Sequence, residues 1–137
     1  MALVRREDAN KYALGFPINP TGTIGVLKAT TGDFLAQQEF SRNHRKEYKS
    51  GEEAAKALMK KRMDLFICDA PTIWWLAGMH EADGLVAVPV LLTREQLAWG
   101  VRRSDTDLLA SVNGALYKLQ QSGRASDIIK HWVPLFK

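Results

Sequence analysis

The sequence has few of the residues that build disulfides, metal sites or nucleic-acid surfaces. Its single cysteine, Cys68, lies inside an apolar run, so we expect it to pack as a small buried hydrophobe. The three histidines are scattered without the spacing of metal ligands. The net charge of +4 is spread along the chain, whereas nucleic-acid binding calls for a clustered basic stripe. We therefore predict no metal, no cofactor and no nucleic-acid partner.

Long apolar segments are also missing from the sequence. No run approaches the roughly 20 residues that a membrane-spanning helix needs, and no signal-peptide pattern is present. If the parent protein is exported, we expect this chain to be a mature fragment from which the leader has been removed. A length of 137 residues with 46% hydrophobic residues is otherwise typical of one globular domain.

Segments typical of strands and helices alternate along the chain and predict a three-layer α/β fold. Ser50 and Glu53 have the spacing of a capping box at the start of a helix. The apolar run after Asp64 lacks alternation, as expected for a strand covered on both faces. We expect strands at residues 2–6, 23–27, 46–49, 64–68, 85–92 and 97–101, and helices at residues 33–40, after Ser50, and at residues 70–79, 104–121 and 125–132.

The first candidate binding element lies where the strand at residues 23–27 leads into a helix. Thr30, Thr31 and Gly32 form this joint, and Asp33 opens the helix. Backbone N–H groups at a helix start are unpaired and, with the helix dipole, favour an anion. The threonine hydroxyls can add donors, and glycine lets a ligand approach the backbone closely. The alternative is that Thr31 only caps the helix and Gly32 only serves the turn.

The second candidate element is Asp69, at the carboxyl end of the strand at residues 64–68. Open α/β sheets bind ligands at this end of their strands. The carboxylate could pair with an ammonium group, or it could simply cap the next helix. Thr30, Thr31 and Gly32 offer donors to an anion, and Asp69 offers an acceptor to a cation. A small zwitterion such as an α-amino acid would satisfy both.

Several segments together resemble the family 3 extracellular solute-binding proteins, the amino-acid receptors of ABC importers. The resemblance covers nearly the whole chain and rests on residues 23–33, 48–58, 62–71, 112–116 and 129–132. It implies the type II periplasmic binding fold with a mixed β-sheet, and a two-lobed, hinged receptor in the periplasm or outside the cell. It also implies that Thr31 and the neighbouring amides bind a ligand carboxylate and that Asp69 binds the α-ammonium group.

The resemblance further implies a division of the chain. Residues 1–6 and 96–102 would be strands that cross between two lobes, and residues 7–95 would form lobe II. Residues 103–137 would be helices that pack on lobe I. Most of lobe I would precede the first crossing strand and is largely missing, so we expect this chain to be a fragment.

We therefore predict a binding protein without enzymatic activity, which works with an ABC transporter permease in the full-length protein. Two alternatives remain open. The same fold also serves as the sensing domain of membrane signalling proteins. A few relatives of this fold are dehydratases that act on a carboxylated ring, and their acid would here be a residue such as Asp69.

The apolar stripe of the helix at residues 104–121 leads to a prediction about assembly. The stripe repeats at helical spacing, and Ile128, Ile129 and Trp132 continue it in the last helix. Without lobe I these side chains would form an exposed apolar patch of the kind found at interfaces. The C-terminal helices could fold back on lobe II, fray, or pack against another copy. Of these we expect the third, as a symmetric or strand-swapped homodimer through residues 1–6 and 97–137.

Overall fold

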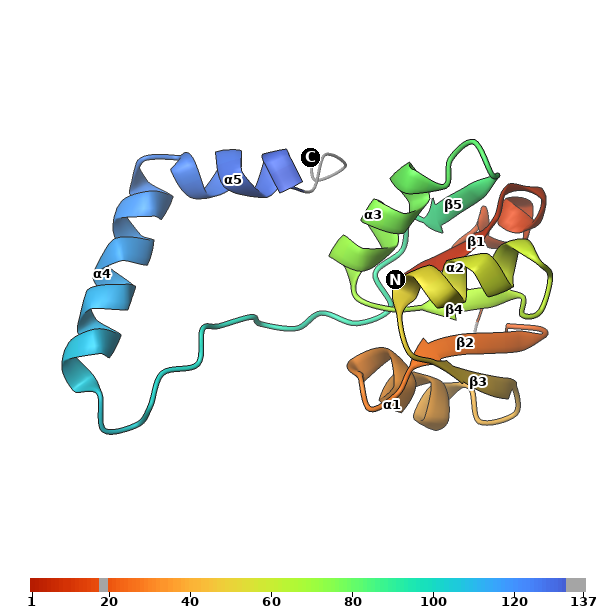
Figure 1. Cartoon of the computed structure of the whole chain (residues 1–137), viewed down its shortest axis with the longest axis horizontal. Helices are drawn as coiled ribbons and strands as arrows, with labels where there is room; N and C mark the ends of the chain where they lie inside the picture. Colours follow the sequence, from red (N-terminus) through yellow and green to blue (C-terminus); the bar gives the residue numbers. More distant parts are fainter. Residues whose placement is uncertain (18–19, 133–137) are drawn as a thin grey trace. The chain divides into compact units, whose positions relative to one another are not determined.

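The chain divides into two compact units, Met1–Arg94 and Glu95–Lys137. The computed structural model describes residues 1–17 and 20–132 (Figure 1). No helix in these two described stretches is long and apolar enough to cross a bilayer.

The first unit is built on one mixed sheet with the strand order β3-β2-β4-β1-β5 (Figure 1). β2 runs parallel to both β3 and β4, and β1 runs antiparallel to β4 and β5. Because β2 and β4 are parallel neighbours, their carboxyl ends meet at one edge of the sheet. The strands are β1 (Ala2–Arg5), β2 (Thr23–Leu27), β3 (His44–Tyr48), β4 (Leu65–Ile67) and β5 (Leu85–Val88).

Helices cover both faces of this sheet. The helical elements of the unit are η1 (Arg6–Tyr12), α1 (Thr31–Glu39), α2 (Gly51–Met59) and α3 (Ala70–Met79). Alternate residues of a strand point to opposite faces. Leu3 and Phe66 therefore pack with α2 and α3 on one face, whereas Val4 and Ile67 pack with α1 and η1 on the other. The prediction of a three-layer α/β fold with a mixed sheet is confirmed.

Local sequence explains where several elements begin and end. The Ser50 hydroxyl accepts a hydrogen bond from the Glu53 N–H at 3.2 Å, so the predicted capping box does start α2. Pro71 lies in the first turn of α3, where its missing N–H costs no hydrogen bond. β5 ends just before Pro89, which cannot donate to a neighbouring strand.

The structure corrects several of the predicted elements. The helix predicted at residues 33–40 is Thr31–Glu39, the strand predicted at residues 46–49 is His44–Tyr48, and the strand predicted at residues 85–92 ends at Val88. After β1, where no helix was predicted, the chain forms the 3₁₀ helix η1. Residues 97–101, predicted to be a strand, form none, and no other strand in the described part of the chain pairs with them. The helix predicted at residues 104–121 begins at Thr106, and Asp105 occupies its N-cap position without a capping hydrogen bond from its side chain.

The second unit consists of α4 (Thr106–Gln121) and α5 (Arg124–Trp132). Neither helix has a buried residue among those described, so the apolar stripe is exposed; Leu108 and Leu109 are 49% and 47% accessible. In the first unit, β1 pairs with β4 and β5 of its own chain, and Ala2, Leu3 and Val4 are fully buried. Residues 2–5 are thus paired within their own chain in this structure.

Candidate functional site

The two predicted binding elements lie at the same edge of the sheet. Val26 near the end of β2 is in register with Ile67 at the end of β4. Thr31 follows β2 by four positions, and Asp69 follows β4 by two. The sheet thus brings the start of α1 and the start of α3 together, as the sequence pattern predicted.

Gly32 sets how closely α1 approaches β4. A Cβ atom at this position would lie 2.9 Å from the carbonyl oxygen of Ile67 and 3.2 Å from its Cγ2 atom. The helix start therefore rests directly on the last residue of β4, two positions before Asp69. The sequence suggested that Gly32 leaves room for a ligand, and the structure shows that it leaves room for the neighbouring strand.

The capping residue of α1 is Thr30, and not Thr31 as the capping alternative had it. The Thr30 hydroxyl donates to the Leu27 carbonyl oxygen at 2.7 Å and accepts from the Asp33 N–H at 3.4 Å. Thr31 is the first residue of the helix, and its side chain is exposed. Capping thus engages the hydroxyl of Thr30 and leaves Thr31 at the surface of the helix start.

Asp69 occupies the N-cap position of α3, but its side chain makes no capping hydrogen bond. Its backbone carbonyl accepts the Ile73 N–H at 3.0 Å, and the residue is exposed. An N-cap aspartate would normally place its carboxylate over the first N–H groups of the helix. No hydrogen bond of the Asp69 side chain therefore supports the capping alternative. The exposed carboxylate of Asp69 can instead accept from a cationic group.

The sequence pattern indicated Asp33 only as the first residue of a helix, but the structure places its side chain beside the candidate site. It is 3% accessible, and its carboxylate accepts hydrogen bonds from the Ala29 N–H at 2.8 Å and from Gln37 Nε2 at 3.0 Å. Arg45 of β3 also pairs with it. Burial alone would raise the pKa of Asp33, but the hydrogen bonds from Gln37 and Ala29 and the charge of Arg45 hold it below the ordinary value. Asp33 is therefore a buried anion beside the candidate site.

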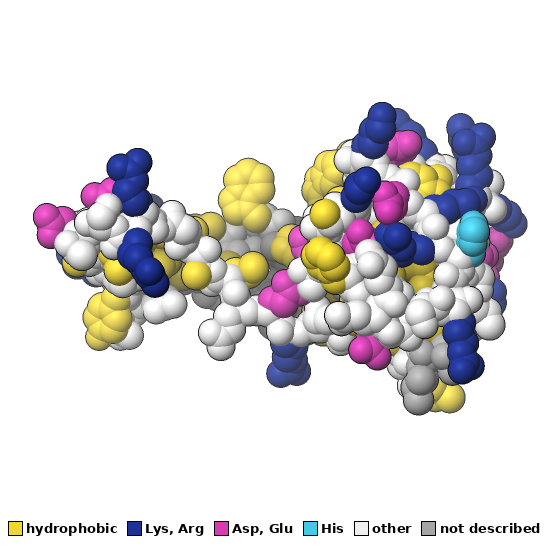
Figure 2. Space-filling model, turned by 90° about the horizontal axis from the view of Figure 1, so that it is seen from below, with side chains coloured by type: hydrophobic (Ala, Val, Ile, Leu, Met, Phe, Trp, Pro, Cys, Tyr) yellow, Lys and Arg dark blue, Asp and Glu magenta, His cyan; other side chains and the backbone are white. Residues whose placement is uncertain are grey.

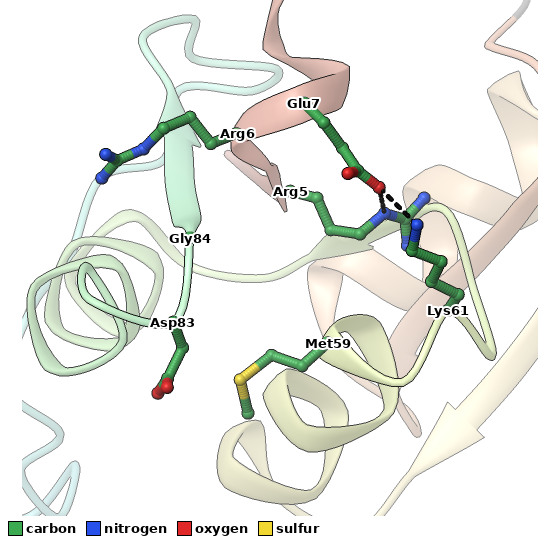
Figure 3. Close-up of a pocket in the computed structure, with 7 residues that line it drawn as sticks. All are labelled: Arg5, Arg6, Glu7, Met59, Lys61, Asp83 and Gly84. Carbon is green, nitrogen blue, oxygen red and sulfur yellow. Dashed lines mark ion pairs between the residues drawn. The ribbon is translucent and has the colours of Figure 1, made fainter.

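A separate hollow of about 500 Å³ lies at the opposite edge of the sheet, where β1 and α3 end (Figure 3). Figure 3 shows Arg5 and Lys61 converging on Glu7, whose carboxylate lies 3.6 Å from Arg5 Nε and 2.8 Å from Lys61 Nζ. Arg5 also donates to the carbonyl oxygens of Leu58 and Met63. Arg5, Lys61 and Glu7 are thus engaged with one another, and the hollow lies away from the starts of α1 and α3.

The charges and metal-ligand types of the described surface are mixed. In Figure 2, Lys and Arg side chains lie interspersed with Asp and Glu over the first unit, without a basic stripe on that face. Among the described residues, no group of three or more His, Cys, Asp or Glu side chains is placed to hold a metal ion. Cys68 is 5% accessible, and burial raises the pKa of its thiol, as expected for a residue of the core.

No family model matches the sequence, and no curated protein matches it. Solved structures do match. A mutant of an arginine-binding protein from T. maritima is 25% identical over 96% of this chain and 56% of that chain, with a TM-score of 0.74. A putative binding component of an ABC transporter from Wolinella succinogenes, in complex with lysine, is 20% identical over 96% and 57%, with a TM-score of 0.78. An ancestral cyclohexadienyl dehydratase is 25% identical over 98% and 56%, with a TM-score of 0.58.

These matches confirm the resemblance to the family 3 solute-binding proteins at the level of the fold. The chain has the type II periplasmic binding fold, and it spans a little over half of the length of the proteins that it matches.

Proposed function

We propose that this chain, which has the fold of the type II periplasmic binding proteins, binds a small solute, and specifically an amino acid. The observation that supports this proposal is the meeting of two opposite binding elements at one edge of the sheet. The start of α1 at Thr31 offers N–H and hydroxyl donors, and Asp69 offers a carboxylate that makes no capping bond. An α-amino acid carries both complementary charges, on two groups that are attached to the same carbon atom.

In this proposal each element has one role. The Thr31 hydroxyl and the first amides of α1 donate to the ligand carboxylate, where the helix dipole also favours an anion. Thr30 and Gly32 shape the same loop, through the cap and through the close approach to Ile67. Asp69 accepts from the ligand ammonium. The arginine-binding and lysine-bound neighbours are named for ligands of this chemical class.

We place the full-length protein in the periplasm or outside the cell, as the receptor component of an ABC transporter. Within it, residues 1–6 and 96–102 would connect two lobes, residues 7–95 would form lobe II, and residues 103–137 would pack on lobe I. In the 137-residue chain by itself, the exposed stripe of α4 and α5 would pair with a second copy. Light scattering at micromolar concentration tests this, and a monomer at that concentration would contradict the dimer.

The ligand proposal is tested by removing the charge of Asp69. A charge-assisted hydrogen bond contributes roughly 1.5–3 kcal/mol, so Asp69→Asn should weaken L-arginine binding by about tenfold to a hundredfold. The desamino analogue of arginine lacks the ammonium group and should bind almost equally to both proteins. Isothermal titration of each protein with each compound gives the four affinities.

Asp83→Asn is the matched control for this experiment. It removes the same charge from an exposed position at the other edge of the sheet, where Asp83 lines the hollow of Figure 3. This variant should bind L-arginine as the unmodified chain does. Equal losses for arginine and its desamino analogue in Asp69→Asn would show that Asp69 is structural. If no amino acid binds the unmodified chain, the proposed function is wrong.

The match to an ancestral cyclohexadienyl dehydratase makes a dehydratase the second candidate. In that case Asp69 would serve as the acid, because its carboxylate is exposed at the sheet edge beside the start of α1. Incubation with a carboxylated cyclohexadienyl substrate, followed by ultraviolet absorbance of the aromatic product, separates the two functions. The binding proposal predicts no product above the uncatalysed rate.

A further inference from the structure

Asp33 holds the candidate ligand loop from inside the structure. The loop runs from the end of β2 to the start of α1 and includes Ala29, whose φ of +57° lies in the left-handed region that residues other than glycine rarely adopt. The Ala29 N–H donates to Asp33 Oδ2 at 2.8 Å. One carboxylate oxygen therefore fixes the loop at the residue with the least favourable backbone conformation.

The second carboxylate oxygen ties this loop to the edge strand β3. Asp33 Oδ1 pairs with the Arg45 guanidinium and accepts from Gln37. Arg45 Nη1 also lies 3.1 Å from Glu47 Oε1, and Glu47 Oε2 lies 3.7 Å from Lys28 Nζ in the loop. These contacts thus connect Ala29 to Lys28 through Asp33, Arg45 and Glu47, and both ends of the connection lie in the loop. The Lys28 contact is exposed and adds little, so the buried Asp33 carboxylate dominates.

Helix α2 offers a comparison within the same molecule. Its cap, Ser50, is followed three residues later by Glu53, whose carboxylate accepts the Lys49 N–H at 3.1 Å. Asp33 stands in the same relation to Thr30 and Ala29. Glu53, however, is exposed, and no arginine of the described residues pairs with its carboxylate. Capping explains the one contact of Glu53 with the Lys49 N–H. It does not explain why Asp33 is buried and paired with Arg45.

We propose that Asp33 and Arg45 are positioning residues for ligand binding, which lock the loop so that Thr31 and the first amides of α1 face the ligand. Neither side chain touches the ligand in this proposal. Asp33 holds the backbone, and Arg45 fixes the orientation of the Asp33 carboxylate from the neighbouring strand. This inference rests on the proposed function for its role in binding, but the locking of the loop can be measured without a ligand.

Amide hydrogen exchange, measured by NMR, tests the lock in the ligand-free chain, because exchange rates report local opening. Asp33→Asn should speed exchange at Ala29 by about tenfold or more. Tenfold corresponds to the weakest hydrogen bonds to a charged acceptor, of about 1.5 kcal/mol. Glu53→Gln is the matched control; it should speed exchange at Lys49 and leave Ala29 unchanged. The Val4 amide of β1 reports whether the whole unit has been destabilised.

Arg45→Met separates positioning from capping, because Arg45 donates to the carboxylates of Asp33 and Glu47, whereas Thr30 makes the cap of α1. It should speed Ala29 exchange severalfold while Val4 stays unchanged, and Arg45→Lys should restore part of the protection. β3 is an edge strand, so Arg45→Met also serves if Asp33→Asn fails to fold. An Ala29 rate that is the same in Arg45→Met and the unmodified chain would overturn the proposal.

Isothermal titration with L-arginine and L-lysine then tests the consequence for binding. Arg45→Met should weaken whichever amino acid binds by severalfold, and Glu53→Gln should not. If Ala29 exchange rises but affinity is unchanged, the lock exists and has no role in binding, which overturns the positioning role. If the unmodified chain binds neither compound nor any other amino acid, the proposed function fails, and the exchange rates still decide whether Asp33 and Arg45 lock the loop.

Discussion

Replacing Gly32 by alanine tests the packing that forms the candidate site. The added Cβ atom would lie 2.9 Å from the Ile67 carbonyl oxygen, which is backbone and cannot move aside as a flexible side chain can. Overpacking of this kind costs roughly 1–3 kcal/mol. Alanine in place of glycine in a helix returns at most about 1 kcal/mol. We therefore expect Gly32→Ala to lower the free energy of unfolding by about 1–2 kcal/mol.

This loss should be visible in thermal and urea unfolding followed by circular dichroism. For a unit of this size each 1 kcal/mol lowers the melting temperature by roughly 4–8 °C. The variant should also bind ligand more weakly, because the first turn of α1 must move away from β4.

Gly78→Ala is the control for this prediction. Gly78 lies in α3, and a Cβ atom there would meet nothing within 4 Å. This variant should gain about 0.5–1 kcal/mol, because alanine is the better helix former. If Gly32→Ala proves as stable as the unmodified chain, or gains stability as Gly78→Ala should, then α1 does not rest on β4 as described.

Three further predictions concern the fold around the site. Leu58→Ala removes a fully buried side chain between α2 and the sheet and should lower the free energy of unfolding in urea by about 2–5 kcal/mol. Ser50→Ala removes the cap of α2 and should lower the free energy of unfolding by about 1 kcal/mol in the same assay. Ser50→Gly should lower it much less, because glycine is also favourable at the N-cap position. The hydrogen bond that protonated His80 donates to the Asp83 carboxylate raises the pKa of His80 above 6.5; burial opposes this shift and Glu52 adds to it. The stability that protonated His80 contributes is therefore complete below pH 6.5 and is lost as the pH rises through the folded-state pKa. Unfolding curves on either side of that pKa should show the loss, and His80→Gln should remove this part of the pH dependence.

Local sequence patterns were sufficient to predict the elements that carry the site. β2 and α3 have the predicted bounds, Thr23–Leu27 and Ala70–Met79, because turn residues and Pro71 limit them locally. The placement of Thr31 and Asp69 at one edge followed from the rule that parallel strands bring their carboxyl ends together.

Contacts between distant residues could not be predicted in the same way. Residues 97–101 look like a strand, but a strand forms only where a partner offers hydrogen bonds, and none does in the described chain. The choice of Thr30 over Thr31 as the cap depends on the Leu27 carbonyl oxygen that holds the hydroxyl. The pairing of Asp33 with Arg45 joins a helix to the next strand, and only the folded arrangement reveals it.

The proposed function requires an amino acid to bind at the edge formed by the starts of α1 and α3. Titration of the isotope-labelled chain with L-arginine, followed by amide chemical shifts, examines this edge residue by residue and also detects weak binding. We expect the largest shift changes to fall on Thr31, Gly32 and Asp69 and to saturate together. Changes confined to Arg6 and Lys61 at the opposite hollow, or no saturable change with any amino acid, would contradict binding at this edge.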